Sequence, residues 1–202
     1  MFLDMPLEEA MRSQRAMRRL SAEPVPEELL LHLLDLAIRA PSGSNAQSWE
    51  WVVVRDRHTV AELGRLNRGA ASLYMRLGKV AAMFGRTGGV SQKMQQSFQW
   101  QADHFDEIPA VIVACQRGRY LPWPFLATSS YFGSIYPAVQ NFLLAARAAG
   151  LGTTLITLPL WRVGRIKRAL NLPRNVTPCC LIPTGWPTGK FGTTPRRPTA
   201  EV

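Results

Sequence analysis

The run over residues 109–116, apolar up to its last residue, Gln116, constrains the fold of this chain more than any other feature of its sequence. A strand with one solvated face would alternate polar and apolar side chains, and this run does not. We therefore expect a strand that is buried on both faces. Such a strand needs helices on each side of its sheet, because each apolar face has to be covered by another apolar surface.

The rest of the chain supplies helices and strands in alternation. Helical spacing of apolar residues predicts helices over 5–20, 27–40, 134–149 and 161–170, and a longer, irregular helical region over 57–104. Short β-branched and apolar runs predict strands over 49–55, 109–116, 153–158 and 176–183. The order predicts a sheet covered by helices. No repeat or linker divides the chain, so we expect a single domain over residues 1–202.

Three connections complete this outline. Residues 85–89 interrupt the long helical region and are polar and Gly-containing enough for a mobile lid. Residues 118–130 are expected to form an aromatic, Pro-containing loop. Gly150 is expected to cap the preceding helix. The irregular tail over 185–202 carries Trp186 and Phe191, so we expect it to lie against another surface, such as a partner subunit.

The charge balance favours a polyanionic partner. The chain has 24 basic and 14 acidic residues, a formal charge of +10. Such an excess suits nucleic acid or a phosphorylated cofactor, and a plain effect on solubility is the alternative. No nucleic-acid motif is present and the arginines are spread along the sequence. We therefore expect no nucleic-acid partner.

Neither a disulfide framework nor a metal site is expected. The three cysteines are Cys115, Cys179 and Cys180, an odd and sparse set. The last two are adjacent, so in a regular strand they would point to opposite faces. The histidines show no metal-ligand spacing. No apolar run reaches the roughly 18 residues of a membrane span, and residues 1–12 have no apolar core of the signal-peptide type, so we expect a soluble cytoplasmic protein without a membrane partner.

The familiar catalytic motifs are missing. The sequence has no GxGxxG, no GxxxxGK[ST], no GxSxG and no Ser–His–Asp set. Its carboxylates are few and stand beside basic residues on helices, so a glycosidase-type pair is not expected. If the protein is an enzyme, a cofactor has to supply the chemistry.

Four features can bind such a cofactor, and each has a plainer interpretation. Arg15 and Arg18 share one face of a predicted helix and can grip a phosphate, or form a solvated basic face. The loop over 41–47 offers hydroxyls and amides to a polyol or a heterocycle, or is only a turn. The strand over 153–158 can face a planar ring, or belong to the core. Residues 195–198 supply a second cation, or a basic tail.

In this order, the four features resemble the flavin-dependent nitroreductase family. The family's R-R-S-x-R-x-F is similar to residues 14–20, and its P-V-P is similar to residues 24–26. Its A-P-S-x-x-N-x-Q-P-W is similar to residues 40–49, and its A-x-x-N-x-x-L-A-A-x-x-x-G-L-G to residues 138–152. Its P-x-G-x-P and its R-x-P are similar to residues 183–187 and 196–198. The resemblance spans nearly the whole chain. It implies an α+β fold, with a central mixed β-sheet covered by helices, in an intertwined homodimer with flavin mononucleotide (FMN) in two sites at the subunit interface.

The resemblance also implies the cofactor-binding positions. These are Gln14, Arg15, Ala16, Arg18, Ser42, Gly43, Asn45, Gln47, Ile156, Thr157, Leu158, Pro159, Leu160, Arg196 and Arg197. Arg15, Arg18 and Arg196 would bind the phosphate. Ser42, Asn45 and Gln47 would contact the ribityl chain or the ring, and residues 156–160 would run beside the ring nitrogen that accepts hydride, where one backbone N–H would form a hydrogen bond. Gln14 and Ala16 replace a usual Arg and Ser, which removes phosphate ligands; Arg12 and Arg197 are candidates to compensate.

The activity implied is ping-pong hydride transfer, in which NADPH or NADH reduces FMN and an acceptor such as a nitroaromatic or a quinone then takes the electrons. No catalytic side chain is required. The alternative is a flavin-binding protein of the same fold that stores, senses or breaks down flavin. Relatives that deiodinate halotyrosines carry Glu and Tyr four residues apart, followed by Lys, in their lid. No such set occurs between residues 66 and 104, so deiodination is not expected.

Two further groups of residues can each be interpreted in two ways. Tyr131 and Phe132 belong to an aromatic cluster that can stack against the acceptor, or can pack an interface. The basic helix with Arg162, Arg165 and Arg168 can attract the phosphates of a nicotinamide cofactor, or form a solvated face.

Overall fold

The computed structural model describes residues 3–83, 92–118 and 125–201. Its centre is a four-stranded sheet in the order β1-β2-β4-β3, and neighbouring strands pair antiparallel. The strands are β1 (Trp49–Val54), β2 (Ala110–Arg117), β3 (Gly152–Thr153) and β4 (Val176–Gly185). Outside the named strands, an isolated bridge between Ala16 and Thr153 is parallel.

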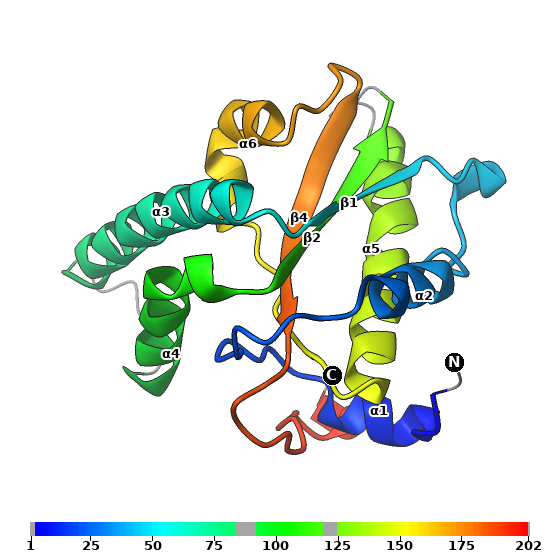
Figure 1. Cartoon of the computed structure of the whole chain (residues 1–202), viewed down its shortest axis with the longest axis horizontal. Helices are drawn as coiled ribbons and strands as arrows, with labels where there is room; N and C mark the ends of the chain where they lie inside the picture. The colour runs from blue at the N-terminus through cyan, green and yellow to red at the C-terminus, as the bar shows by residue number, and fades with distance from the viewer. Residues whose placement is uncertain (1–2, 84–91, 119–124, 202) are drawn as a thin grey trace.

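Helices cover both faces of this sheet (Figure 1). They are α1 (Leu7–Ser13), α2 (Glu27–Ala37), α3 (Arg57–Met83), α4 (Gln92–Asp103), α5 (Phe125–Ala148) and α6 (Val163–Ala169). Short 3-10 turns lie between them: η1 (Gly43–Asn45), η2 (Phe105–Glu107), η3 (Leu158–Arg162) and η4 (Thr199–Glu201). The lid predicted at residues 85–89 lies outside the described residues.

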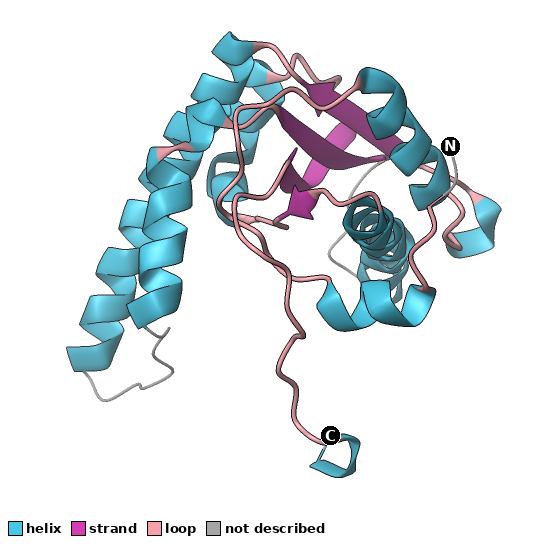
Figure 2. Ribbon diagram, turned by 60° about the horizontal axis from the view of Figure 1, so that its bottom comes forward, coloured by secondary structure: helices cyan, strands magenta, loops and turns pink. Residues whose placement is uncertain are grey.

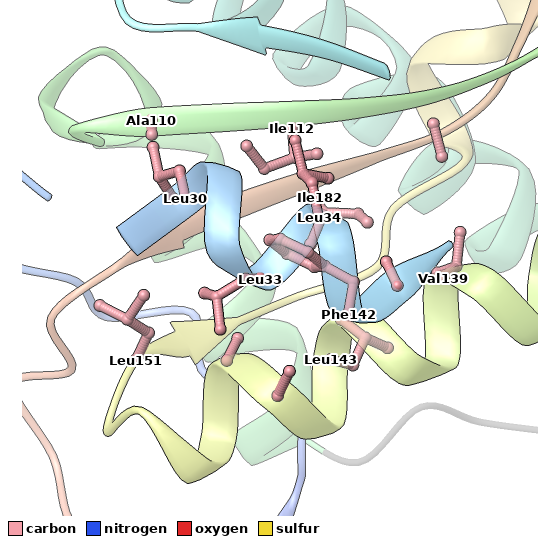
Figure 3. Packing of buried hydrophobic residues seen from close by; sticks show 14 of the residues in the cluster. Leu30, Leu33, Leu34, Ala110, Ile112, Val139, Phe142, Leu143, Leu151 and Ile182 are labelled. Carbon is pink, nitrogen blue, oxygen red and sulfur yellow. The ribbon is translucent and has the colours of Figure 1, made fainter. Parts of the chain in front are cut away.

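Strand β2 is buried on both faces, as its unbroken apolar run predicts. Residues 110–116 are all buried. Alternate side chains, such as Ile112, pack with α2 and α5, whereas the others, such as Val113, pack beneath α3 and α6. Figure 3 shows the first of these cores, a cluster to which Leu33 of α2, Phe142 of α5 and Ile112 of β2 belong. Each such side chain contributes roughly 1.5–3 kcal/mol on burial, which makes this sandwich the main source of stability.

Local sequence explains the ends of the two helices in that core. Helix α2 begins after Pro26, and Glu27 and Glu28 place negative charge in its first turn, at the positive end of the helix dipole. Gly150 caps the C-terminal end of α5, with a φ of 80° that few other residues adopt. The N–H of Leu151 donates to the Ala146 carbonyl at 2.8 Å, the long bond of a Schellman cap. The prediction of a glycine cap at Gly150 is confirmed.

The helix predicted over residues 5–20 is wrong beyond Ser13. The chain after α1 is extended, because it pairs with the segment that follows α5. The Met17 N–H donates to the Thr153 carbonyl at 2.8 Å, and the Thr154 hydroxyl donates to the Met17 carbonyl at 2.7 Å. Arg15 and Arg18 therefore do not share a helical face. Pairing between distant segments has overridden a local preference for helix.

The strand predicted over 153–158 is also largely wrong. Only Gly152 and Thr153 pair as a strand, although Ile156 exchanges two backbone hydrogen bonds with Leu181, each 2.9 Å long. From Leu158 the chain turns into η3, with Pro159 in its first turn. The loop predicted over 118–130 is shorter than expected, since α5 already begins at Phe125.

A β-bulge alters the predicted arrangement of the two adjacent cysteines. The register between β2 and β4 shifts by one residue after Ala114, which pairs with Cys180, whereas Cys115 pairs with Pro178. Cys179 is the extra residue, and both it and Cys180 lie in the core beneath α2 and α5. Opposite orientation of neighbouring side chains holds only where the strand is regular.

No helix in the described part of the chain is long and apolar enough to cross a membrane.

Candidate functional site

Two arginines of the extended segment 14–20 form a positive centre without a negative partner. Burial, and then the charge of Arg15, lower the pKa of the Arg18 guanidinium below its usual value. The Arg18 Nε atom is buried and has no hydrogen-bond partner. Within the described residues, neither arginine is in an ion pair. A buried cationic donor of this kind is costly unless an anion reaches it, so this pair is a candidate anion site.

The chain on either side of Arg15 is held by short-range contacts. Gln14 is half-buried, and its N–H caps α1 by donating to the Ala10 carbonyl at 2.8 Å. Ala16 is exposed and pairs with the strand segment through its backbone. Arg12 Nε lies 2.7 Å from Glu8 Oε1, so a carboxylate already pairs with this candidate substitute for a phosphate ligand.

The C-terminal tail passes beside this pair. The Phe191 ring lies 4.0 Å from the guanidinium carbon of Arg147, which holds the tail against the end of α5. A Cβ added to the next residue, Gly192, would lie 3.8 Å from Arg15 Nη1. Arg196 lies farther along, in a groove against α1, and Arg197 is exposed. The structure thus brings Arg15 and Arg18 together, with the tail as their neighbour and Arg196 over α1.

The loop over residues 42–47 is exposed and strained. Ser44, Asn45 and Gln47 have φ values of 51°, 53° and 48°, a left-handed conformation that is uncommon outside glycine. The Ser42 hydroxyl oxygen accepts a 3.0 Å hydrogen bond from the Gln47 N–H, which closes the loop on itself. Strained backbone at an exposed position is typical of a binding site, where the strain holds polar groups ready for a ligand.

Gly43 anchors this loop to α5. Its N–H donates to the Ser134 hydroxyl at 2.9 Å. A Cβ at this position would come within 2.7 Å of Ser130 Oγ, closer than such atoms approach. A larger residue at this position would require the Ser130 hydroxyl to rotate away, so glycine lets the loop lie this near the helix without that change.

The arginine pair and this loop lie at different levels of α5. The loop contacts α5 at Ser134, whereas the chain just before Arg15 contacts it where Arg147 Nε donates to Ser13 Oγ at 2.8 Å. Thirteen residues separate these contacts, which corresponds to roughly 20 Å along a helix. In Figure 1 the chain between α1 and α2 lies at the lower left, and the chain between α2 and β1 lies at the upper right. One subunit does not bring the two parts together.

The segment expected beside a flavin ring starts in the core and ends at the surface. Ile156 and Pro159 are buried, whereas Thr157 is exposed. The Thr157 carbonyl accepts a 2.9 Å hydrogen bond from the N–H of Leu160. Within the described residues, the Thr157 N–H has no backbone acceptor. Leu158 and Leu160 are half-buried, so the segment offers an apolar surface beside one free N–H.

Two buried amides were not found by sequence reasoning. Asn67 on α3 and Gln101 on α4 are 2% and 1% exposed. Among the residues that the structure describes, the Asn67 Oδ1 and Gln101 Nε2 atoms have no hydrogen-bond partner. Their helices adjoin, since Arg68 Nε donates to the Ala102 carbonyl at 3.1 Å. No signal in the sequence marks Gln101, because α4 contains five glutamines and only the packed structure shows that this one is buried.

The segment that carries Arg18 reaches these helices too. The guanidinium of Arg19 lies over the Trp100 ring of α4, 5.3 Å from its centroid. The chain next to Arg18 therefore contacts α4, and α4 contacts α3, so neighbouring contacts link the three segments that carry Arg18, Asn67 and Gln101. Because buried polar groups are nearly always hydrogen-bonded, such a group indicates a place for a polar ligand.

Tyr131 and Phe132 pack at the end of the sheet. The Tyr131 hydroxyl donates to the Gln116 carbonyl at 3.4 Å, and Gln116 Nε2 donates back to the Tyr131 carbonyl at 3.0 Å. Burial raises the pKa of Tyr131 to about 12. The Phe132 ring meets the Tyr131 ring edge-on, with centroids 5.2 Å apart. These contacts account for both residues by packing, and the role in acceptor binding stays a prediction.

The cysteines are not candidate nucleophiles. Burial raises the pKa of Cys115 to about 12 and that of Cys179 to about 11, and it raises the pKa of Cys180 further. Thiols in this state are hardly ionised near neutral pH, and the thiolate is the reactive form. Among the described residues, no three of His, Cys, Asp and Glu lie close enough to hold a metal ion.

Comparison with known proteins gives a consistent result. The model of the nitroreductase family matches residues 11–186. A Methanothermobacter thermautotrophicus protein named "Putative NADH dehydrogenase/NAD(P)H nitroreductase" is 28% identical over 188 residues, 92% of this chain and 79% of that protein. The iodotyrosine deiodinase of Thermotoga neapolitana is 26% identical over 195 residues, 95% of this chain and 92% of the relative.

Solved structures agree on the fold. The crystal structure of an oxidised iodotyrosine deiodinase, bound to FMN and 3-iodo-L-tyrosine, matches with a TM-score of 0.75 at 22% identity, and the match covers 96% of each chain. The fold expected from the sequence, an α+β architecture with a central sheet covered by helices, is confirmed.

Proposed function

Since the chain belongs to the nitroreductase family, we propose that it is an FMN-dependent oxidoreductase that takes hydride from NADH or NADPH and reduces a small acceptor such as a nitroaromatic or a quinone. Bound FMN would accept the hydride and pass the electrons on in a second step. The side chains of the protein have to bind and orient the reactants and exclude water. This scheme requires no activated nucleophile among the side chains of the protein.

The observation that carries the proposal is the unpaired arginine pair. Arg15 and Arg18 repel each other, and Arg18 is half-buried without an acidic partner in the described residues. A phosphate monoester would relieve this repulsion and accept a hydrogen bond from the orphaned Arg18 Nε. The residues present therefore fit the phosphate end of FMN, even with Gln14 and Ala16 at two flanking positions. Arg196 and Arg197 are proposed to approach from the tail.

The orphaned amides fit the polar edge of the flavin ring. That edge carries carbonyl oxygens, which accept hydrogen bonds, and an N–H group, which donates one. Gln101 Nε2 is an unused donor and Asn67 Oδ1 an unused acceptor. We assign these two residues to the ring, and the exposed N–H of Thr157 to its reacting edge, with Ile156, Leu158, Pro159 and Leu160 as the apolar wall beside it.

The site is proposed to be shared by two copies of the chain. The loop with Ser42, Gly43, Asn45 and Gln47 lies roughly 20 Å along α5 from the arginine pair. In a dimer, the loop of a second copy of the chain can reach the arginine pair, whereas the loop of the same chain cannot.

The surface of α5 supports this dimer. The helix has one charged residue, Arg147, among 24 residues. Phe125 and Leu126 at its start are 74% and 78% exposed. The tail beyond β4 lies against α5 at Phe191 and against α1 at Arg196, and only its last residues extend away from the rest of the chain (Figure 2), as a segment that contacts a partner subunit would. Large apolar side chains that stay exposed in one subunit are typical of a homodimer interface.

The acceptor is proposed to be something other than a zwitterionic amino acid. Residues 66–104 contain no glutamate, so they lack one member of the set that deiodinases are expected to carry in their lid. Nitroaromatics and quinones need no such set, because they are recognised mainly through a flat ring. Tyr131 and Phe132 stay candidate contacts for such a ring.

A comparison of FMN with riboflavin tests the proposal. Riboflavin lacks the phosphate, so Arg18→Gln should weaken FMN binding by about 10- to 100-fold and leave riboflavin binding unchanged; this is the range for one charge-assisted hydrogen bond. The charge-matched control is Arg39→Gln, which removes an exposed arginine paired with Asp35. Flavin fluorescence measures both affinities. Equal FMN affinity in Arg18→Gln and the control would contradict the assignment.

A further inference from the structure

A second arginine-rich site lies outside the region assigned to FMN. Helix α3 packs beside η3 and α6 (Figure 1). A cleft of about 510 Å³ opens between them. Four arginines line it: Arg65 from α3, and Arg162, Arg165 and Arg168 from η3 and α6. Clefts of this size hold small organic molecules.

The charge in this cleft is not compensated. Glu62 is the only carboxylate among its lining residues. Six arginines elsewhere are in ion pairs, whereas none of the four cleft arginines is, within the described residues. Helix α6 has no acidic residue in its first turn. Because like charges held together repel one another, an anionic ligand would stabilise this arrangement.

The spacing of the arginines suits several phosphate oxygens at once. Arg162, Arg165 and Arg168 recur every third residue, so they share one face of the η3–α6 element. Arg65 faces them from another helix. Each guanidinium can donate two parallel hydrogen bonds to a phosphate. A group with more than one phosphate would use this two-sided arrangement better than a single phosphate does.

The rest of the cleft suits the organic part of a nucleotide. Leu66 gives it an apolar lining, and a Cβ added to Gly69 would meet no atom within 4 Å, so the space above it is open. Outside the residues that line the cleft, Trp161 precedes Arg162 on η3 and is 56% exposed. An exposed indole is a surface on which a flat base stacks.

We propose that this cleft, defined by the four arginines, binds the adenosine phosphates of the NADH or NADPH donor. The proposal rests on the proposed function for the identity of the nucleotide. It follows from the continuity of η3, which starts at Leu158, beside the proposed flavin ring, and ends at Arg162 in the cleft. A donor whose nicotinamide lies against the ring would thus find its phosphates next to these arginines.

Calorimetric titration of the FMN-saturated protein tests this cleft directly, without turnover. The probes are ADP, adenosine 2′,5′-bisphosphate, unphosphorylated adenosine and inorganic phosphate. The variant is Arg165→Gln/Arg168→Gln. The control, Arg39→Gln/Arg174→Gln, removes the same charge from exposed positions outside the cleft.

We expect the two adenosine phosphates to bind the wild type and the control alike, and adenosine and inorganic phosphate to bind far more weakly. The cleft variant should lose about tenfold in affinity for each arginine, or about 100-fold in all, with its FMN affinity unchanged. In turnover, KM for NADPH should rise in this variant while KM for the acceptor does not.

Several results would overturn the proposal. Equal ADP affinity in the cleft variant, or no ADP binding by the wild type, would exclude the cleft as a nucleotide site. Inorganic phosphate binding as tightly as ADP would exclude recognition of the adenosine. An unchanged KM for NADPH would exclude the donor as occupant. If ADP binding depends on the arginines but the protein binds no FMN, the cleft site stands and the proposed function fails instead.

Discussion

Both the fold and the proposed phosphate site require that residue 152 has no side chain, which only glycine provides. A Cβ added there would lie 2.8 Å from Leu20 Cδ2 and 2.9 Å from Met17 Cβ. The leucine tip can rotate away. The Met17 Cβ cannot, because the backbone that carries it would have to move. The change Gly152→Ala should therefore push the 14–20 segment, and Arg18 with it, away from β3.

The cost of this displacement can be derived in two ways. Overpacking of a dense core costs roughly 1–3 kcal/mol. If the segment yields instead, it loses the hydrogen bonds that join Met17 to Thr153 and Thr154, at 2.8 and 2.7 Å. These are worth about 1 kcal/mol each. Both routes give a loss of about 2 kcal/mol, which for a chain of this size lowers Tm by roughly 4–8 °C.

Urea unfolding of the flavin-free protein, at one fixed protein concentration, measures this loss. The matched control is Gly164→Ala, because a Cβ there meets no atom within 4 Å and alanine favours the helix. The control should gain about 0.5–1 kcal/mol. FMN affinity should fall in Gly152→Ala and stay unchanged in the control. A Gly152→Ala protein as stable as the wild type, with full FMN affinity, would refute the reasoning.

Three further predictions follow from buried or capping groups. The three thiols should not react with a disulfide reagent in the native protein at pH 8, and all should react after unfolding; rapid labelling of the native protein would contradict their burial. Asp56 accepts hydrogen bonds at the start of α3, chiefly from Thr59, which hold its pKa below the usual value. The wild type should thus be more stable than Asp56→Ala above the pKa that this carboxyl has in the unfolded chain, and this advantage should vanish as pH falls through its lower pKa in the folded protein. Urea midpoints of both proteins, measured against pH, would show the loss. An advantage that persists in acid would contradict the assignment. Asn67→Leu removes an unsatisfied buried oxygen, so the flavin-free variant should be as stable as the wild type or up to about 2 kcal/mol more stable. Its FMN binding should be weaker. Lower stability with unchanged FMN affinity would show that Asn67 is structural.

The sequence predicts well those elements whose pattern is local. Helix α2 and strands β1, β2 and β4 lie within a few residues of their predicted positions. Their apolar spacing is strong, and Pro or Gly marks their ends. The burial of β2 on both faces was predictable for the same reason: its composition excludes a solvated face.

The elements that distant contacts determine were not predictable. Residues 14–20 have helical spacing, yet they are extended because Met17 pairs with Thr153. The two ends of that pairing stand more than 130 residues apart, and no local pattern reports it. The bulge at Cys179 is similar, since a register shift between strands leaves no mark on either strand alone.

The candidate site shows the same division. Arg15 and Arg18 were identified by their spacing, but the helix that was to join them is absent and their proximity has another origin. Asn67 and Gln101 were missed because their importance lies in burial without a partner. Burial and hydrogen bonding are properties of the packed chain and not of its local sequence.

The most direct test of the FMN assignment is the visible absorption spectrum of the purified, desalted protein, followed by addition of NADPH without oxygen. We expect flavin bands, present as purified or after FMN is added, that bleach with NADPH and return when an acceptor is supplied. No bands after FMN addition and desalting would contradict it, because the site built on Arg15 and Arg18 would then not hold the cofactor.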